Sequence, residues 1–335
     1  MYDPGTLYVD PILSDFSVGF QDQTLYGYEF APETPVRTQS GSYRVFDRSA
    51  WMIYPSRREP GTVANEIRGA KWSQDTFSTH EHSLQVPIWD EERQQYTSLG
   101  GLANAVFGGD LTIDPETDAT ALAIRSIELE HELIVANAIR NTANYPGANT
   151  TTLSGTSQWN DYTNGTASVS NPVANIQTAI TAIWNATRRY PNLMAIPTMG
   201  VQYIANHPRV VDRFKTFNLL QPDAFQLLTG FDGRIIYVDS VYNSAQNIDA
   251  TISVADFWGK DVWIGLSDPT PGQKTQTFMK TFSQIYPNGG TRPVDRWREE
   301  GRKSDLVRAS RKWDIKIVAS GAGYLIKNAF AASAF

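Results

Sequence analysis

One long helix constrains the fold of this 335-residue chain more than any other feature of its sequence. We expect it to begin at Pro115, whose fixed backbone angle suits the first helical turn, and to end near residue 144, before Pro146 and Gly147. Its apolar residues form two stripes: Leu122, Leu129 and Leu133, and Ile124, Ile127, Ile134 and Ala138. A helix of this length with apolar residues on two sides is expected to contact structural layers on both.

Runs of apolar and β-branched residues indicate strands before and after this helix. The runs before it flank a polar tract over 55–80, which predicts a projecting hairpin. The tract 141–175 is rich in Asn, Thr, Ser and Gly, so we expect an excursion or a poorly ordered region, which Trp159 and Tyr162 could pin to the body. Further helices are expected over 173–189 and 201–214, further strands over 193–197, 234–238, 251–254 and 261–266, and a hairpin-like pair of strands over 313–318 and 324–327. Mixed elements of this kind predict an α+β or α/β domain.

The residues needed for several kinds of catalytic or metal site are missing or wrongly spaced. The chain has no Cys, which excludes disulfides and thiolate metal sites, and its closest histidines, His80 and His82, have no third ligand nearby. Glu130, His131 and Glu132 lack the spacing of a zinc-binding helix, so we expect a polar patch there. No phosphate-binding glycine loop or nucleophile elbow is present. A catalytic carboxylate pair among the 35 acids stays open as an alternative.

The N-terminal region carries no secretion signal. Its first residues combine acids with early prolines in place of a basic run and an apolar core, and no apolar stretch of the chain is long enough to span a membrane. Residues 1–42 contain four prolines with aromatic side chains between them. This pattern predicts an extended arm that buries its aromatic groups against its own subunit or a neighbour.

The segment 291–330 combines dense charge with apolar runs. Residues 292–314 hold eight Arg or Lys and five Asp or Glu, so the segment is basic within a chain of net charge −6. Charges of both signs fit a surface that meets another protein better than one that meets nucleic acid, because the acids repel phosphates. A solvated edge of strands and loops fits the same residues equally well.

Three segments resemble the major capsid proteins of tailed double-stranded DNA bacteriophages, which have the Hong Kong 97-type fold. They are the strand and helix of 190–210, with its His207-Pro208 end, the region 252–265, and the segment 291–330. The order of the parts also agrees. The resemblance implies an α+β fold with an N-terminal arm over 1–42, an extended loop over 43–90, a peripheral domain over 91–172 and 291–335 with its spine helix near 115–144, and an axial domain over 173–290.

The same resemblance implies a structural protein and not an enzyme, with no cofactor or metal. Copies would assemble as pentamers and hexamers into an icosahedral shell, built in the host cytoplasm, around double-stranded DNA that this acidic chain contacts weakly and without sequence specificity. The expected partners are a separate scaffolding protein, since only a short arm begins the chain, a portal protein and, as a further candidate, a decoration protein, but no membrane. Lys71 and Asn328 are formally available for a crosslink between subunits, although chance explains them better.

The segment 291–330 follows an arm, a hairpin, a spine helix and a mixed domain in the sequence. This position favours it as a contact surface between subunits. The candidate interface residues are Arg57, Arg58, Arg68, Lys71, Trp72, Arg296, Trp297, Arg298, Arg302, Arg308, Arg311 and Trp313. Two alternatives remain: an encapsulin-like nanocompartment shell, which resembles the same fold, and a cytoplasmic hydrolase. The shells would form megadalton particles, whereas the hydrolase would form a monomer or a small oligomer.

Overall fold

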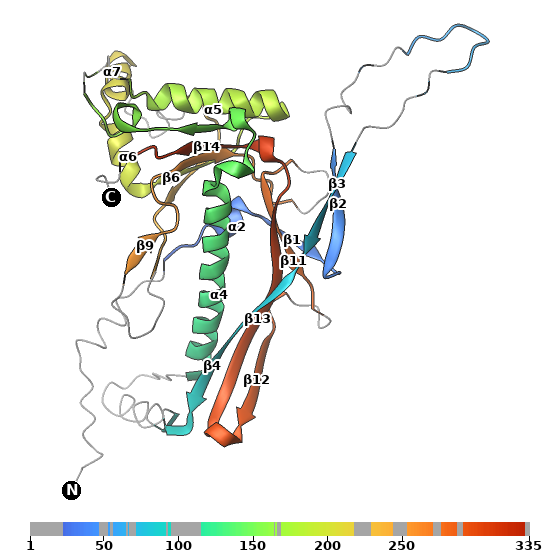
Figure 1. Cartoon of the computed structure of the whole chain (residues 1–335), viewed down its shortest axis with the longest axis vertical. Helices are drawn as coiled ribbons and strands as arrows, with labels where there is room; N and C mark the ends of the chain where they lie inside the picture. The colour runs from blue at the N-terminus through green and yellow to red at the C-terminus, as the bar shows by residue number, and fades with distance from the viewer. Residues whose placement is uncertain are drawn as a thin grey trace.

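A long helix links two β-sheets in the computed structural model of this chain (Figure 1). The structure describes residues 23–46, 53, 56–64, 66, 72–91, 93–94, 115–163, 165, 169–217, 229–243, 253–270, 276–286 and 291–331. The helix is α4 (Pro115–Arg140); one five-stranded sheet lies along it and the other lies at its C-terminal end (Figure 1). None of the helices within these residues has the length and apolar character needed to cross a membrane.

The first sheet combines strands from both ends of the sequence. Its members are β1 (Glu33–Val36), β4 (His80–Trp89), β11 (Met279–Gln284), β12 (Val294–Glu299) and β13 (Ser304–Ile317). Their order is β1-β11-β13-β12, and β4 pairs antiparallel with β13 along the opposite edge. Because side chains alternate along a strand, Val307 and Ala309 of β13 both face α4. Val307 packs there with Ala119, and Ala309 packs with Ala123.

The second sheet holds the main core of the molecule. Its members are β5 (Thr150–Thr152), β6 (Leu193–Pro197), β7 (Arg234–Val238), β10 (Val262–Gly265) and β14 (Gly323–Lys327), in the order β5-β14-β10-β6-β7. The helices α5 (Pro172–Thr187), α6 (Thr198–Ala205) and α7 (Pro208–Phe217) lie around it (Figure 1). The Asn171 side chain starts α5 by accepting a hydrogen bond from the backbone N–H of Ala174, and Pro172 occupies the first turn.

Several elements follow the sequence closely, and some helices end earlier than expected. β6 and β7 have the predicted bounds. α4 ends at Arg140 because the Asn141 side chain accepts a hydrogen bond from Ala143 and starts a separate 3₁₀ turn, η2 (Thr142–Asn144). The helix expected over 201–214 is divided into α6 and α7, since Pro208 lacks the N–H needed to continue the first of them.

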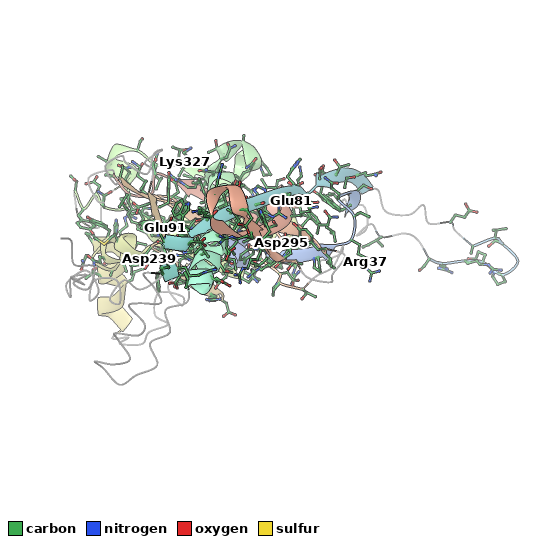
Figure 2. The ribbon with its side chains drawn as sticks, turned by 90° about the horizontal axis from the view of Figure 1, so that it is seen from below. Arg37, Glu81, Glu91, Asp239, Asp295 and Lys327 are labelled. Carbon is green, nitrogen blue, oxygen red and sulfur yellow. The ribbon has the colours of Figure 1, made fainter. Side chains whose placement is uncertain are left out.

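The projecting hairpin consists of β2 (Ser40–Phe46) and β3 (Trp72–Ser78). It extends sideways from the body, with Arg37 near its base (Figure 2). β4, which falls within the expected extended loop over 43–90, pairs with β13 over its whole length. The physical reason is burial: Val86 and Ile88 of β4 pack in the apolar clusters beneath α4.

Residues 23–36, which fall within the expected arm over 1–42, pack against the body of their own subunit. Phe30 in α2 (Gly27–Phe30) is fully buried, and it contacts the rings of Trp258 and Trp263. β1 then pairs in parallel with β11 and so joins the first sheet. Residues 1–22 of the predicted arm lie outside the described residues.

The last two strands lie in different sheets, so the predicted hairpin-like pair over 313–318 and 324–327 is wrong. Val318 and Ala319 both donate backbone hydrogen bonds to the carbonyl of Phe278, and the turn η7 (Ser320–Ala322) then carries the chain into the second sheet. β14 pairs there with β10 and with β5. The pairing with β5, together with the complete burial of Trp159, confirms that the tract after α4 is pinned to the body.

Two short strands complete the described fold. β8 (Val241–Asn243) and β9 (Val254–Asp256) pair antiparallel with each other. The strand expected over 251–254 therefore begins only at its last residue, and residues 251–252 lie outside the described part of the chain.

Candidate inter-subunit surface

Many of the predicted interface residues lie at the end of the first sheet that points away from the second sheet (Figure 1). Three strands run side by side there: β4, β12 and residues 304–313 of β13. We call them the three-stranded tip. α4 packs on one face of the tip, and the opposite face is here named the outer face.

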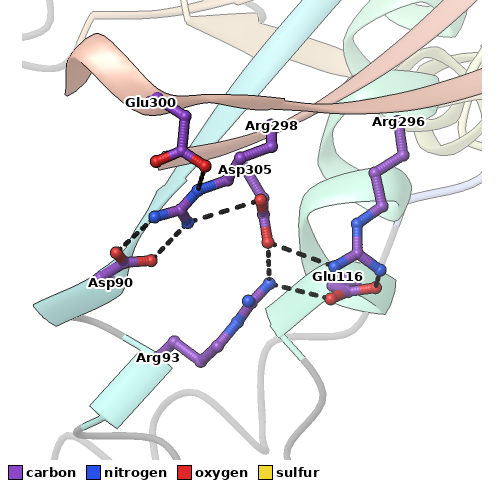
Figure 3. A network of polar contacts seen from close by, with 7 residues as sticks. All are labelled: Asp90, Arg93, Glu116, Arg296, Arg298, Glu300 and Asp305. Atoms are coloured by element: carbon purple, nitrogen blue, oxygen red, sulfur yellow. Dashed lines mark hydrogen bonds and ion pairs between the residues drawn. The ribbon is translucent and has the colours of Figure 1, made fainter. Parts of the chain in front are cut away.

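A network of ion pairs holds the three-stranded tip to the start of α4 (Figure 3). Its centre is the carboxylate of Asp305 on β13, whose side chain is only 8% exposed. Arg93 approaches this carboxylate at 2.5 Å, Arg296 at 3.2 Å and Arg298 at 3.5 Å. The other acids bound by these arginines are Asp90, Glu116 and Glu300. The network therefore ties β4, β12, β13 and α4 to one another.

The network lowers the pKa of two of its acids. Burial acts to raise the pKa of Asp305, but hydrogen bonds from Arg93 and Arg296 outweigh it and hold the pKa below its ordinary value. The hydrogen bond from Arg298 lowers the pKa of Asp90. A carboxyl group with a lowered folded-state pKa stabilises the fold above its unfolded pKa, and this contribution is lost as the pH falls through the folded value. The network should therefore weaken only in acid, below about pH 4.

Asp305→Asn is expected to lower the free energy of unfolding at neutral pH by about 1–2 kcal/mol, because three arginines lose the charge that they share. The variant should also lose less stability than the wild type between about pH 5 and pH 3, since its amide does not titrate. Urea unfolding across this range measures both effects. Glu300→Gln is the control, because Glu300 is exposed and contacts Arg298 at 3.6 Å. Equal acid sensitivity of Asp305→Asn and the wild type would contradict the role given to the network.

The other predicted arginines of the tip also have acid partners in their own chain. Arg308 pairs with Asp295 at 2.8 Å, and Arg302 lies 3.6 Å from Glu299. The candidates of the polar tract are not brought to this network. Arg57 and Arg58 are exposed, Arg68 and Lys71 lie outside the described residues, and Trp72 begins β3 with its side chain outside the described part.

Arg311 and Trp313, two of the predicted interface residues, are buried within the subunit. Each is only 3% exposed. Arg311 pairs with Glu33 at 3.0 Å and lies over the ring of Tyr28. Trp313 stacks on His82, with ring centroids 3.9 Å apart. The alternation of β13 explains both positions, since these two residues share the face of Val307 and Ala309, which is covered by α4.

The histidines of β4 form no metal site with other residues. His82 contacts Glu130 through Nδ1 at 3.2 Å. Across the described part of the chain, no group of three or more His, Cys, Asp or Glu side chains is placed to hold a metal ion.

Known proteins resemble this chain over almost its whole length. No protein-family model matches it. In sequence it is similar to the major capsid protein of Burkholderia phage BcepMu, with 24% identity over 326 residues that cover 95% of each chain. It is also similar to the major capsid protein of Pseudomonas phage JBD67, with 23% identity over 243 residues that cover 70% of this chain and 67% of the relative.

Solved structures show the same architecture. A phage-related protein from Bordetella bronchiseptica superposes with a TM-score of 0.66 and 22% identity, covering 96% of this chain and 97% of that one. The capsid structure of cyanophage P-SCSP1u gives a TM-score of 0.55 with 9% identity, covering 92% and 89% of the two chains. The chain has the Hong Kong 97-type capsid fold. This confirms the α+β fold class and the resemblance to tailed-phage major capsid proteins that were predicted from the sequence.

In this capsid fold, a buried carboxylate on the long helix has a role that the sequence did not reveal. Glu132 was expected in a polar patch, but it is fully buried. Its Oε2 accepts backbone hydrogen bonds from Tyr26, at 3.0 Å, and from Gly27. Its Oε1 accepts from Trp258 Nε1 at 2.8 Å and from Ser240 Oγ at 3.2 Å. Glu132 thus joins α4 to the N-terminal segment and to the strands around the second sheet.

His131, the neighbour of Glu132, is buried as well. Its ring stacks on Tyr28 with centroids 4.2 Å apart, and Nε2 lies 3.0 Å from the Thr281 hydroxyl. Burial, with a further contribution from the charge of Arg311, lowers the pKa of His131 to about 3. Nothing in the local sequence of α4 distinguishes these two polar residues from exposed ones. They are buried because segments distant in the sequence pack against them.

Proposed function

We propose that this chain is a major capsid protein whose copies assemble as pentamers and hexamers into an icosahedral shell around double-stranded DNA. The observation that carries the proposal is the similarity to the major capsid protein of phage BcepMu, which spans 95% of both chains. The capsid fold supports it independently. The role is structural, and it needs neither catalysis nor a cofactor.

The charge of the chain supports weak contact with the packaged DNA. A net charge of −6 gives no overall attraction to phosphates, so any DNA contact would be non-specific and would let the DNA slide during packaging. The proposed partners are other copies of the chain, a separate scaffolding protein, a portal protein and a decoration protein. The shell would form in the host cytoplasm and persist as the capsid of the virion.

The parts of the fold have proposed places in such a shell. The hairpin β2–β3 would belong to the extended loop that lies across a neighbouring subunit. α4 would be the spine of a peripheral domain that includes the first sheet, and the second sheet would form the axial domain. The exposed residues Arg57, Arg58, Trp297 and Arg302 remain candidates for contact with neighbouring copies.

Sedimentation velocity of the expressed full chain tests the proposal, with and without a co-expressed scaffolding protein. We expect megadalton particles, which a small cytoplasmic hydrolase would not form. Particles isolated from infected cells should contain double-stranded DNA; an enzyme cargo in its place would favour a nanocompartment shell. A chain that stays a monomer or small oligomer under every assembly condition would refute the shell function.

A further inference from the structure

We infer that the outer face of the three-stranded tip binds a second copy of the chain through a tryptophan patch. The patch consists of Trp89, Trp297, Leu306 and Pro87. This inference rests on the proposed shell function and assigns one of the surfaces through which its subunits meet. The sequence pointed mainly to arginines as the residues that contact a neighbour, whereas we assign this contact to aromatic side chains.

The strand register brings the patch together. Trp297 of β12 lies opposite Leu306 of β13, and Leu306 lies opposite Pro87 of β4. Trp89 lies opposite Ser304 in the adjoining row on the same face. Side chains that are directly opposite in antiparallel strands share a face and contact one another. Leu306 is only 4% exposed, whereas Trp89 is 45% and Trp297 37% exposed. The two indoles therefore shield Leu306 and leave much of their own apolar surface in water.

The described elements of the subunit leave Trp89 and Trp297 partly exposed on this face. α4 packs on the other face of the same strands, where it buries Val307 and Ala309. The arginines of the tip are engaged with acids of their own chain, so a neighbouring acid would have to compete for them. Arg308 pairs with Asp295 and also lies over the Trp297 ring, 5.0 Å from its centroid. Trp and Arg together are the residue types that most often dominate the binding energy of interfaces.

The rim of the patch fits another copy of the chain and excludes nucleic acid. It carries both signs of charge, with Asp295 and Glu299 beside Arg308 and Arg302. The acids would repel phosphates, which argues against DNA or RNA as the occupant. A surface of mixed sign can complement a second copy of itself, because each copy offers acids to the bases of the other.

The size of the patch also points to a repeated assembly. Each exposed indole offers on the order of 100 Å², which is far below the roughly 800 Å² that a stable interface between two proteins buries on each partner. A free partner held by this patch alone would dissociate. In a closed symmetric shell every copy makes several contacts at once, so a small aromatic contact suffices to set the register of neighbours.

Assembly of full-length variants tests the inference. Trp89→Ala/Trp297→Ala should raise the critical concentration for assembly at least about tenfold, while Trp89→Phe/Trp297→Phe, which keeps rings over Leu306, should raise it less than about threefold. Tyr190→Ala is the matched control, because Tyr190 is an exposed aromatic residue outside the tip. Arg302→Gln tests the ionic alternative and should raise the critical concentration less than the double alanine variant does. Tyr190→Ala should stay within about twofold of the wild type. Light scattering gives the critical concentration, and circular dichroism shows that each variant is folded.

Hydroxyl-radical footprinting of the wild type is the second measurement, and it does not depend on how a variant folds. Trp89 and Trp297 should be protected in assembled particles relative to free subunits. Equal accessibility in both states, assembly of the double alanine variant at the wild-type concentration, or a larger effect of Arg302→Gln would overturn the inference. If wild-type shells form in any of these cases, the proposed function stands without it. A wild-type chain that never associates refutes both.

Discussion

Glu132→Gln is expected to lower the free energy of unfolding by about 2–4 kcal/mol, since the carboxylate accepts hydrogen bonds from three separate segments of the chain. A glutamine has one oxygen acceptor where the carboxylate has two. Its NH₂ group would face either the backbone N–H groups of Tyr26 and Gly27 or the donors of Ser240 and Trp258. Buried donors would then lose their acceptor. A buried donor without an acceptor lowers the stability by more than an ordinary hydrogen bond adds to it. Urea unfolding followed by circular dichroism measures the change.

Glu130→Gln is the matched control for this prediction. Glu130 lies two residues away on the same helix, but it is exposed and contacts only the half-buried His82 in the described structure. Its substitution should change the unfolding free energy by less than about 0.5 kcal/mol. Similar losses of unfolding free energy in the two variants would mean that removing any acid from α4 destabilises the fold. Glu132 would then have no special role.

Trp159→Ala is expected to cost about 3–5 kcal/mol, which is the usual range for removing a fully buried aromatic side chain. Trp159 is completely buried and meets the ring of Phe330 edge to face, with centroids 5.6 Å apart. Its backbone N–H also donates to Ala329 at 2.7 Å. The side chain thus fastens the segment after α4 to the end of the chain. Thermal unfolding should show the loss, and limited proteolysis should cut the segment 141–163 faster.

Two further variants separate the packing of Trp159 from other effects. The Trp159 indole N–H is buried and has no acceptor among the described residues, so Trp159→Phe should cost only about 1–2 kcal/mol. Tyr162→Ala should cost less than about 1 kcal/mol, because Tyr162 is partly exposed and the substitution removes the hydrogen bond from its hydroxyl to the Tyr203 carbonyl. If Trp159→Ala proved no more damaging than Tyr162→Ala, the segment would not depend on this anchor.

The elements with strong local signals could be predicted from the sequence. β6 is a run of five buried residues and β7 is a β-branched run, and both have the expected bounds. α4 begins at Pro115, where the proline and the acids after it indicated a helix start. These signals lie within a few residues of the element itself. They therefore do not depend on how distant parts of the chain fold.

Strand partners and burial of polar residues could not be predicted in the same way. β13 and β14 follow each other in sequence and read equally well as a hairpin, yet they join different sheets. Strand pairing depends on residues far along the chain, such as the ten residues of β4 that pair with β13. Glu132 and Glu130 are alike in sequence. Glu132 is buried because distant segments pack on it, with hydrogen bonds from Tyr26, Ser240 and Trp258.

The charged segment 291–330 shows that the candidate site could be predicted from the sequence only in part. Its arginines suggested contacts with neighbouring chains, but Arg296, Arg298 and Arg308 have acid partners in their own subunit. Counting charges along a sequence does not reveal whether opposite charges meet within one chain. The period of two along β12 and β13 does carry a usable signal, because it separates the exposed Trp297 from the face that holds the buried Arg311 and Trp313.

Electron cryo-microscopy of the particles formed by the expressed chain is the most direct test of the shell function. We expect closed icosahedral particles built from pentamers and hexamers, with each subunit showing the two sheets and the long helix α4. Density from a neighbouring copy should cover Trp89 and Trp297. Small oligomers under every condition, with or without a scaffolding protein, would contradict the capsid function.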